Sequence, residues 1–250
     1  MHYETVDGAV CGNGTPVGMG IMRGDPTSTT LVVIINGGGA CWDGLSCFVL
    51  NGASYLHTTY TEATFAQKAA GLESSPLLHR DDESNPLRDA HLAYVPYCTG
   101  DIHSGIAVRE YPYDIFGNKY TVHHAGRVNA TLFAARLAEQ MPHAQHVFLI
   151  GMSAGGFGAV FTHDVFAAAF PGAVVDVLSD SAPLVPTKDP ALFATWMTTW
   201  NSTLPSGCAN CGTVPSAIID ARRAQNPQDR FALIAVGNDH VIRAFFGLRR

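Results

Sequence analysis

A short apolar run that ends in a glycine-flanked serine constrains this sequence more than any other feature. Residues 146–150 are a histidine followed by Val-Phe-Leu-Ile, a composition typical of a buried strand. They lead into Gly151-Met-Ser153-Ala-Gly155, after which the chain continues with helical spacing. Gly-x-Ser-x-Gly between a strand and a helix indicates a nucleophile elbow, a sharp turn that lifts the serine out of the sheet. The sequence therefore predicts Ser153 as a catalytic nucleophile; the alternative is a tight turn that carries a surface serine.

Two segments are predicted to supply an oxyanion hole. The N–H of Ala154 is expected at a helix N-terminus, directed at a developing negative charge. The triplet Gly37-Gly38-Gly39 follows a predicted buried strand at residues 31–35. In α/β hydrolases a glycine-rich loop at this place provides the other donors, so Gly38 and Gly39 are the candidates. A phosphate-binding loop is disfavoured because the P-loop lysine and a complete Gly-x-Gly-x-x-Gly are both absent.

The candidate acid of a catalytic triad is Asp239. It follows a predicted last strand at residues 231–236, and the order Ser then Asp fits the order Ser, Asp or Glu, His of α/β hydrolases. The alternative role for Asp239 is a helix N-cap, and Asp180, after a predicted strand at 173–178, is the runner-up acid. Only His240 follows Asp239 among the histidines, and its side chain is expected to leave the helix in another direction. No general base is therefore evident.

Asp101 and His103 follow a predicted strand at residues 91–96. Polar groups just past the carboxyl end of a strand lie beside the active site in an open α/β sheet. The two residues are therefore candidates for binding substrate or for bracing the glycine loop. The alternative is a purely structural role, with the histidine bonded to local backbone.

Length and composition favour one enzyme-like domain over residues 1–250. Of the 250 residues, 47% are apolar and only 14% are charged, which excludes a disordered chain. Helical spacing at 61–72 and 122–140 alternates with the predicted strands. We expect an α/β-hydrolase-like fold: a mostly parallel central sheet with helices on both faces, a small antiparallel β unit at residues 1–30 and a helical cap segment at 184–228. No metal or other cofactor is expected.

Charge and hydropathy limit the partners. The formal net charge is −6 without a basic cluster, so nucleic acid is not expected as a partner. The apolar runs reach about five to eight residues, too short to span a membrane. The first five residues lack the charged and apolar regions of a signal peptide. We expect a monomer that acts on an acylated carbohydrate or another small ester.

The six cysteines suggest disulfide bonds and hence a secreted or periplasmic protein. Cys47 lies six residues after Cys41 and is placed to close the glycine loop covalently. Cys208 and Cys211 favour a local disulfide; half of a zinc site is the alternative, although a second pair with metal spacing is absent.

Taken together, the motifs resemble the pectin acetylesterase family, which also contains the Notum carboxylesterases. The matching stretches are residues 36–42 (NGGGACW), 97–105 (YCTGDIHSG), 151–158 (GMSAGGFG), 180–181 and Asp239. The resemblance implies a secreted, metal-free α/β-hydrolase-like esterase with Ser153 as nucleophile and Asp239 as acid, and with Gly38, Gly39 and Ala154 forming the oxyanion hole. The plant enzymes of the family have a glutamate in place of Asn36 and a tryptophan in place of Ala40.

The sequence therefore predicts a serine carboxylesterase that hydrolyses O-acetyl or other short acyl esters, with a polysaccharide as the candidate carrier. The family's histidine lies in a C-terminal segment without a counterpart here, so the chain is expected to be C-terminally truncated and weakly active. The alternatives are a non-catalytic family member that acts as a binding domain, and a serine lipase or peptidase on the same fold.

Overall fold

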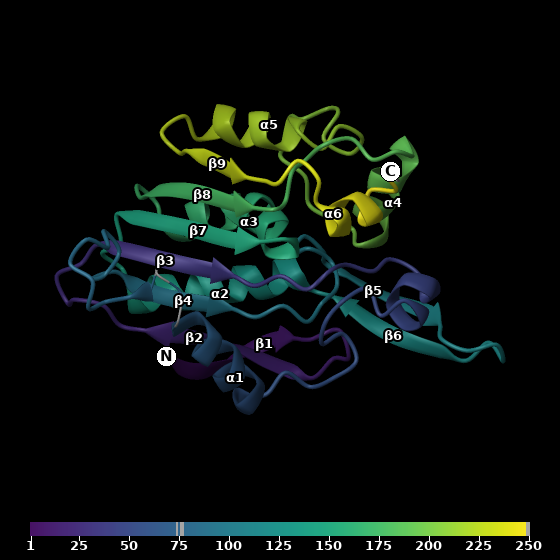
Figure 1. The fold of residues 1–250 in the computed structure, drawn as a ribbon, viewed down its shortest axis with the longest axis horizontal. Coiled ribbons are helices and arrows are strands. Elements are labelled where there is room, and N and C mark those ends of the chain that lie inside the picture. Colours follow the sequence, from purple (N-terminus) through teal and green to yellow (C-terminus); the bar gives the residue numbers. More distant parts are fainter. Residues whose placement is uncertain (74, 76–77, 249–250) are drawn as a thin grey trace.

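A seven-stranded sheet with the order β1-β2-β4-β3-β7-β8-β9 forms the centre of the protein (Figure 1). The computed structural model describes residues 1–73, 75 and 78–248. The five strands from β4 to β9 in this order are parallel, whereas β1 and β2 are antiparallel to their neighbours. The strands are β1 (His2–Val10), β2 (Pro16–Met22), β3 (Thr30–Ile35), β4 (His91–Val95), β7 (His146–Met152), β8 (Val174–Asp180) and β9 (Phe231–Ile234). The predicted mostly parallel sheet with a small antiparallel β unit at the N-terminus is confirmed.

Helices pack on both faces of this sheet (Figure 1). On one face, α2 (Gly126–Gln140) and α3 (Ala154–Ala169) cover alternate residues of the central strands, since successive side chains of a strand point to opposite faces. On the other face, Phe65 of α1 (Glu62–Glu73) contacts Tyr94 of β4, with ring centroids 5.8 Å apart. The carboxyl ends of β3 and β7 lie side by side, since Ile35 pairs with Gly151. This pairing brings the segment after β3 next to the elbow.

Beyond β8, the described residues form three helices, of which the first and last lie near the carboxyl ends of the strands and the middle one lies alongside β9 (Figure 1). They are α4 (Pro190–Thr199), α5 (Ala217–Gln225) and α6 (His240–Phe245). Arg222 of α5 is buried and pairs with Asp164 of α3 at 2.8 Å, which fixes α5 against the elbow helix. Asp189 caps α4 by accepting the Ala191 N–H at 2.9 Å. No helix within the described ranges is long and apolar enough to cross a membrane.

One helix begins later than the sequence predicted. The helical spacing was expected from residue 122, but residues 119–124 form β6 (Lys119–His124), which pairs with β5 (Ala107–Pro112) in a hairpin. Val122 pairs with Arg109 and is buried, so its apolar side chain belongs to the hairpin and not to the helix. The helix starts at Gly126, whose N–H donates to Asp101 Oδ2 at 2.7 Å. A buried carboxylate therefore marks the helix start.

Three disulfides link the six cysteines. The bonds join Cys41 to Cys47 and Cys208 to Cys211, as expected, and the remaining pair, Cys11 and Cys98, joins the end of β1 to the segment after β4. Because the sulfurs of Cys208 and Cys211 are bonded to each other, they are not available as zinc ligands, as half a zinc site would require. Disulfides are typical of proteins that fold in an oxidising compartment.

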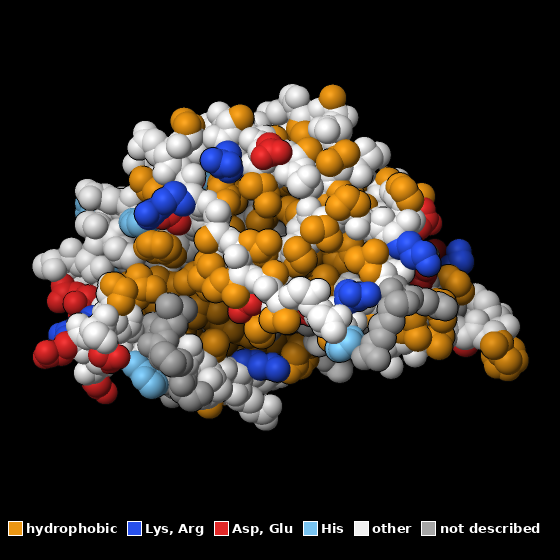
Figure 2. All heavy atoms as spheres, turned by 45° about the horizontal axis from the view of Figure 1, so that its top comes forward, with side chains coloured by type: hydrophobic (Ala, Val, Ile, Leu, Met, Phe, Trp, Pro, Cys, Tyr) orange, Lys and Arg blue, Asp and Glu red, His pale blue; other side chains and the backbone are white. Residues whose placement is uncertain are grey.

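The edge of the sheet at β9 is apolar and open to solvent. Leu233, Ile234, Val236 and Val241 are each more than half exposed. Figure 2 shows hydrophobic side chains gathered across the middle of the face that carries this edge. A short η1 turn (Leu45–Val49) after the glycine loop exposes further apolar side chains. An exposed apolar edge strand favours association between chains.

Candidate active site

Ser153 occupies a strained turn between β7 and α3. Its backbone has φ 56° and ψ −125°, a positive φ that non-glycine residues rarely adopt. The Ser153 N–H donates to the carbonyl oxygen of Asp180 at 2.8 Å, so the neighbouring strand β8 holds the turn in place. Such strain persists only where the surrounding structure enforces it, and it is concentrated at functional sites. The backbone therefore has the conformation that the elbow motif predicts.

The elbow glycines lie where backbone segments touch. A β-carbon at Gly155 would lie 2.0 Å from the carbonyl oxygen of Ile35, and one at Gly151 would lie 2.1 Å from the carbonyl oxygen of Gly155. Both distances are far below van der Waals contact, so neither position accepts a side chain. The close approach brings the start of α3 against the glycine loop that follows β3.

The glycine loop is held by hydrogen bonds to its carbonyl groups. The Gly38 carbonyl accepts the Ser54 N–H, and the Gly39 carbonyl accepts the Tyr97 hydroxyl, both at 2.8 Å. Since the C=O and N–H of a trans peptide point in opposite directions, the bond to Ser54 turns the Gly39 N–H away from Ser54. Over the described ranges, neither the Gly39 nor the Ala154 N–H has an acceptor. These two amides are thus available to an oxygen of a substrate.

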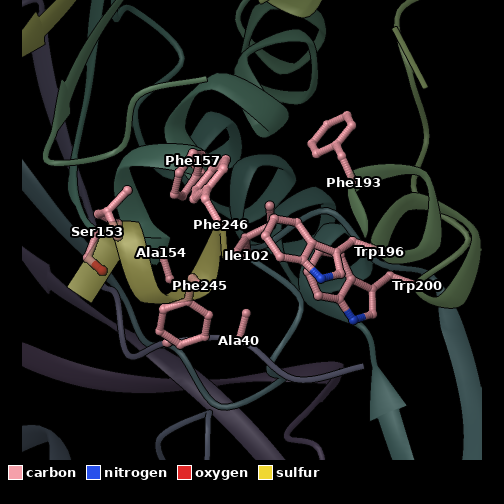
Figure 3. A pocket seen from close by; sticks show the side chains of 12 residues that line it. Ala40, Ile102, Ser153, Ala154, Phe157, Phe193, Trp196, Trp200, Phe245 and Phe246 are labelled. Atoms are coloured by element: carbon pink, nitrogen blue, oxygen red, sulfur yellow. The ribbon is translucent and has the colours of Figure 1, made fainter. Parts of the chain in front are cut away.

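An apolar pocket adjoins Ser153 (Figure 3). Counted as the space open to the centres of water-sized molecules, its volume is about 30 Å³. Figure 3 shows Ser153 and Ala154 on one side of the pocket, and the rings of Phe193, Trp196 and Trp200 on the other. The lining comes from the glycine loop, the segment after β4, the elbow and its helix, α4 with the residue after it, and α6 with the residue after it: Gly39, Ala40, Ile102, Ser153, Ala154, Phe157, Phe193, Trp196, Trp200, Ile242, Phe245 and Phe246. Of the three oxyanion candidates, Gly39 and Ala154 line this pocket and Gly38 does not.

Asp101 and His103 lie beneath the glycine loop and are buried. The Asp101 carboxylate accepts four donors of the protein itself: the Thr99 hydroxyl and the N–H groups of His103, Gly105 and Gly126. His103 Nε2 donates to the Asn36 carbonyl at 2.8 Å, at the start of the glycine loop. With these partners the two side chains fit the bracing role, the second of the two roles considered from the sequence.

Stability is expected to fall as the pH is lowered from 6.5 to 4. Burial lowers the pKa of His103 and of His124 from 6.5 to about 4, so the unfolded chain binds protons that the folded chain excludes. Burial raises the pKa of Asp101 from 3.8 to about 6, which acts in the opposite sense between these values. Two imidazoles against one carboxyl give a net loss on the order of 3 kcal/mol. Urea denaturation at pH 7 and pH 4 measures this difference in the free energy of unfolding. Equal or greater stability at pH 4 would contradict the conclusion that burial keeps His103 and His124 neutral.

Both candidate acids follow strands on the same side of the elbow strand, because Asp180 ends β8 and Asp239 comes after β9 in the order β7-β8-β9. Asp239 caps α6, since its Oδ1 accepts the N–H groups of Val241 and Ile242 at 2.9 Å. Its Oδ2 has no hydrogen-bond partner among the residues described. Asp180, at the end of β8, accepts the Ser181 hydroxyl at 2.8 Å and is tied to Ser153 only through its backbone carbonyl.

No histidine in the described part of the chain is hydrogen-bonded to Ser153. The buried rings of His103, His124 and His163 each have other partners: the Asn36 carbonyl, the Tyr111 hydroxyl with the Thr99 carbonyl, and Asp229. His240 is exposed at the first position of α6. Within the same residues, no three His, Cys, Asp or Glu side chains converge as a metal site would require.

The sheet, its flanking helices and the elbow above β7 place the protein among the α/β-hydrolase-like folds. Within that class, the pectinacetylesterase model matches residues 1–218, and the chain belongs to this family of carboxylic ester hydrolases. The family resemblance drawn from the motifs is therefore confirmed. No curated protein sequence matches the chain.

Solved structures share the fold, among them two crystal forms of one protein. The Wnt deacylase Notum from Drosophila, crystal form II, superposes with a TM-score of 0.67 at 18% identity, over 98% of this chain and 73% of that chain. Crystal form I of the same protein gives a TM-score of 0.58 at 19% identity, over 92% and 69% of the two chains. At these identities the likeness concerns the fold.

Proposed function

We propose that the protein is a serine carboxylesterase in which Ser153 is the nucleophile. The observation that carries the proposal is the strained Ser153 backbone beside two amides, of Gly39 and Ala154, that have no acceptor within the described ranges. Ala154 is buried, and buried backbone N–H groups without partners are rare in folded proteins. Amides that are fixed before the reaction stabilise the negative charge of a tetrahedral intermediate. Gly38 is the third candidate donor.

The proposed reaction is acyl transfer to water. Ser153 Oγ adds to the ester carbonyl carbon, and its hydroxyl proton passes to a water molecule of the solvent, since no described histidine is bonded to Ser153. The carbonyl oxygen becomes an oxyanion that accepts the Gly39 and Ala154 N–H groups. The intermediate collapses, the bond to the alcohol oxygen breaks, and the alcohol departs with a proton. Water then adds to the acyl-enzyme and releases the carboxylic acid and Ser153.

Asp239 is proposed as the acid of the triad, and its unpartnered Oδ2 supports this role because that oxygen can accept an N–H from a histidine. No described histidine reaches Ser153, so we expect a rate below that of a complete triad.

The acyl group is proposed to be short and uncharged. The pocket beside Ser153 is lined with aromatic and aliphatic side chains, which favour an apolar group over a charged one. The family's name points to acetyl esters, and the structural neighbour is named a deacylase of Wnt. We therefore propose O-acetyl or other short acyl esters as substrates, with a polysaccharide as the carrier of the acyl group.

A matched series of p-nitrophenyl esters tests this proposal. From acetate to butyrate, kcat/KM is expected to rise roughly fourfold per methylene, since each buried CH₂ contributes about 0.8 kcal/mol. The succinate monoester has the same number of acyl carbons as butyrate but ends in a carboxylate. It is expected to react at least about tenfold more slowly, because the pocket offers its charge no partner. A preference for succinate over butyrate would refute an apolar acyl site.

Residues 184–228 are proposed as a cap over the substrate. Supporting this role, α4 of this segment contributes Phe193 and Trp196 to the pocket lining, and Trp200 follows directly. We also propose a secreted or periplasmic location, which the three disulfides support.

The second candidate function is a non-catalytic binding domain for acylated ligands. It is favoured by the lack of a hydrogen bond between Ser153 and any described histidine. The two functions differ in turnover. A binding domain would bind butyrate esters, and any hydrolysis of them would be equal in the wild type and in Ser153→Ala.

A further inference from the structure

Tyr97 lies directly beneath the glycine loop, just beyond the end of β4. Its side chain is fully buried, and its hydroxyl joins two backbone segments. The hydroxyl donates to the Gly39 carbonyl at 2.8 Å and accepts the Ile102 N–H at 2.9 Å. Both partners, Gly39 and Ile102, line the pocket beside Ser153.

The conformation of the segment after β4 is unusual at the point where it meets Tyr97. Ile102 and His103 have φ values of 49° and 60°, two consecutive non-glycine residues in the left-handed region. The buried Asp101 carboxylate stabilises this turn by accepting the His103 and Gly105 N–H groups. The turn directs the Ile102 N–H at the Tyr97 hydroxyl, which orients that hydroxyl to donate to Gly39.

Side-chain hydrogen bonds therefore fix the glycine loop at both of its ends. His103 Nε2 donates to the Asn36 carbonyl at the start of the loop, and the Tyr97 hydroxyl donates to the Gly39 carbonyl at its end. The rings of Tyr97 and His103 are packed together, with centroids 4.8 Å apart. Glycines have no side chain to limit their rotation, so the loop depends on such contacts for a fixed conformation.

We propose that Tyr97 is a positioning residue that locks the Gly39–Ala40 peptide and so limits rotation at Gly39, which keeps the preceding Gly39 N–H in the orientation needed to stabilise the oxyanion. This inference rests on the proposed esterase function. The Tyr97 hydroxyl does not touch the substrate; it acts through the Gly39 carbonyl. Burial raises the pKa of Tyr97 well above its ordinary value, so the hydroxyl stays a donor over the working pH range.

The test compares Tyr97→Phe with Tyr111→Phe. Each change removes one buried hydroxyl: Tyr97→Phe loses the bonds to Gly39 and Ile102, and Tyr111→Phe loses the bond that the Tyr111 hydroxyl donates to His124 Nε2 at 2.9 Å in the β5–β6 hairpin, outside the pocket lining. With butyrate esters, Tyr97→Phe is expected to lower kcat by roughly 10- to 100-fold, since one misplaced oxyanion donor costs about 10²–10³-fold. KM should change less than about threefold. Tyr111→Phe should retain kcat within about twofold.

A second readout does not depend on activity. Amide hydrogen exchange of residues 36–41 is expected to be about tenfold faster in Tyr97→Phe than in the wild type, with other peptides unchanged, and unaltered in Tyr111→Phe. Equal exchange in the loop, or kcat values equal in the two variants, would overturn the positioning role. If the wild type shows no hydrolysis that depends on Ser153, the proposed function fails, and the exchange data alone decide whether Tyr97 fixes the loop.

Discussion

Replacing Ser153 with alanine is expected to lower hydrolysis of butyrate esters by roughly 10²-fold or more and to prevent formation of an acyl-enzyme. Alanine keeps the β-carbon of serine and removes only the oxygen that would bond to the acyl group. At a φ of 56°, alanine is under the same backbone strain as serine because both have a β-carbon. The elbow is therefore expected to keep its conformation. Stability should change by less than about 1 kcal/mol. The loss is therefore chemical and not structural.

The measurement is turnover of wild type and Ser153→Ala over pH 5 to 9, alongside urea denaturation of both proteins. A rate that depends on Ser153 and rises near the usual pKa of histidine would mean that an imidazole takes the proton. A rate that depends on Ser153 without such a rise would fit the absence of a hydrogen-bonded histidine among the residues described. Equal rates in a folded variant would sink the nucleophile assignment.

Gly155→Ala is expected to destabilise the fold by about 3 kcal/mol and to lower hydrolysis by roughly 10²-fold or more. The added β-carbon would lie 2.0 Å from the Ile35 carbonyl oxygen and 2.8 Å from the Asn36 carbonyl carbon. Both are backbone atoms, so no side-chain rotation relieves the clash. The start of α3 must move away from β3, which separates the Ala154 N–H from the glycine loop. A displacement near 1 Å is enough for such a loss of rate.

Gly71→Ala provides the matched control. Gly71 lies in α1, where an added β-carbon meets no atom within 4 Å among the described residues beyond its own turn of helix. Alanine is the better helix former by about 1 kcal/mol, so stability should stay the same or rise. Thermal and urea unfolding of both variants, with butyrate hydrolysis, complete the comparison. A Gly155→Ala protein as stable and active as the wild type would show that the elbow tolerates a side chain and that the contact is not decisive.

The central strands and the elbow could be predicted from the sequence because their signals are local. The apolar run before Ser153 and the strand before the glycine loop are short, continuous and bounded by glycine, which leaves little room for another interpretation. Parallel strands also share the edge at which they end, so two glycine-rich segments after such strands were expected to meet. The pairing of Ile35 with Gly151 brings them together.

The β5–β6 hairpin and the role of Tyr97 could not be predicted, because both depend on contacts between distant residues. Val122 also fits a helical pattern, and its pairing with Arg109 depends on the turn between the two strands. Tyr97 precedes a cysteine in an ordinary strand end, and nothing nearby in the sequence indicates that its hydroxyl reaches Gly39, 58 residues away. The aromatic side chains of α4 and α6 meet in one pocket only in the folded protein.

The most direct test of the central claim is intact-mass and peptide mass spectrometry after reaction with a fluorophosphonate, which forms a stable adduct with an activated serine. The account predicts one adduct per chain, on the peptide that contains Ser153, and none on Ser153→Ala. An adduct on another residue, or no adduct on a folded wild-type protein, would contradict Ser153 as the nucleophile and would favour the non-catalytic binding domain.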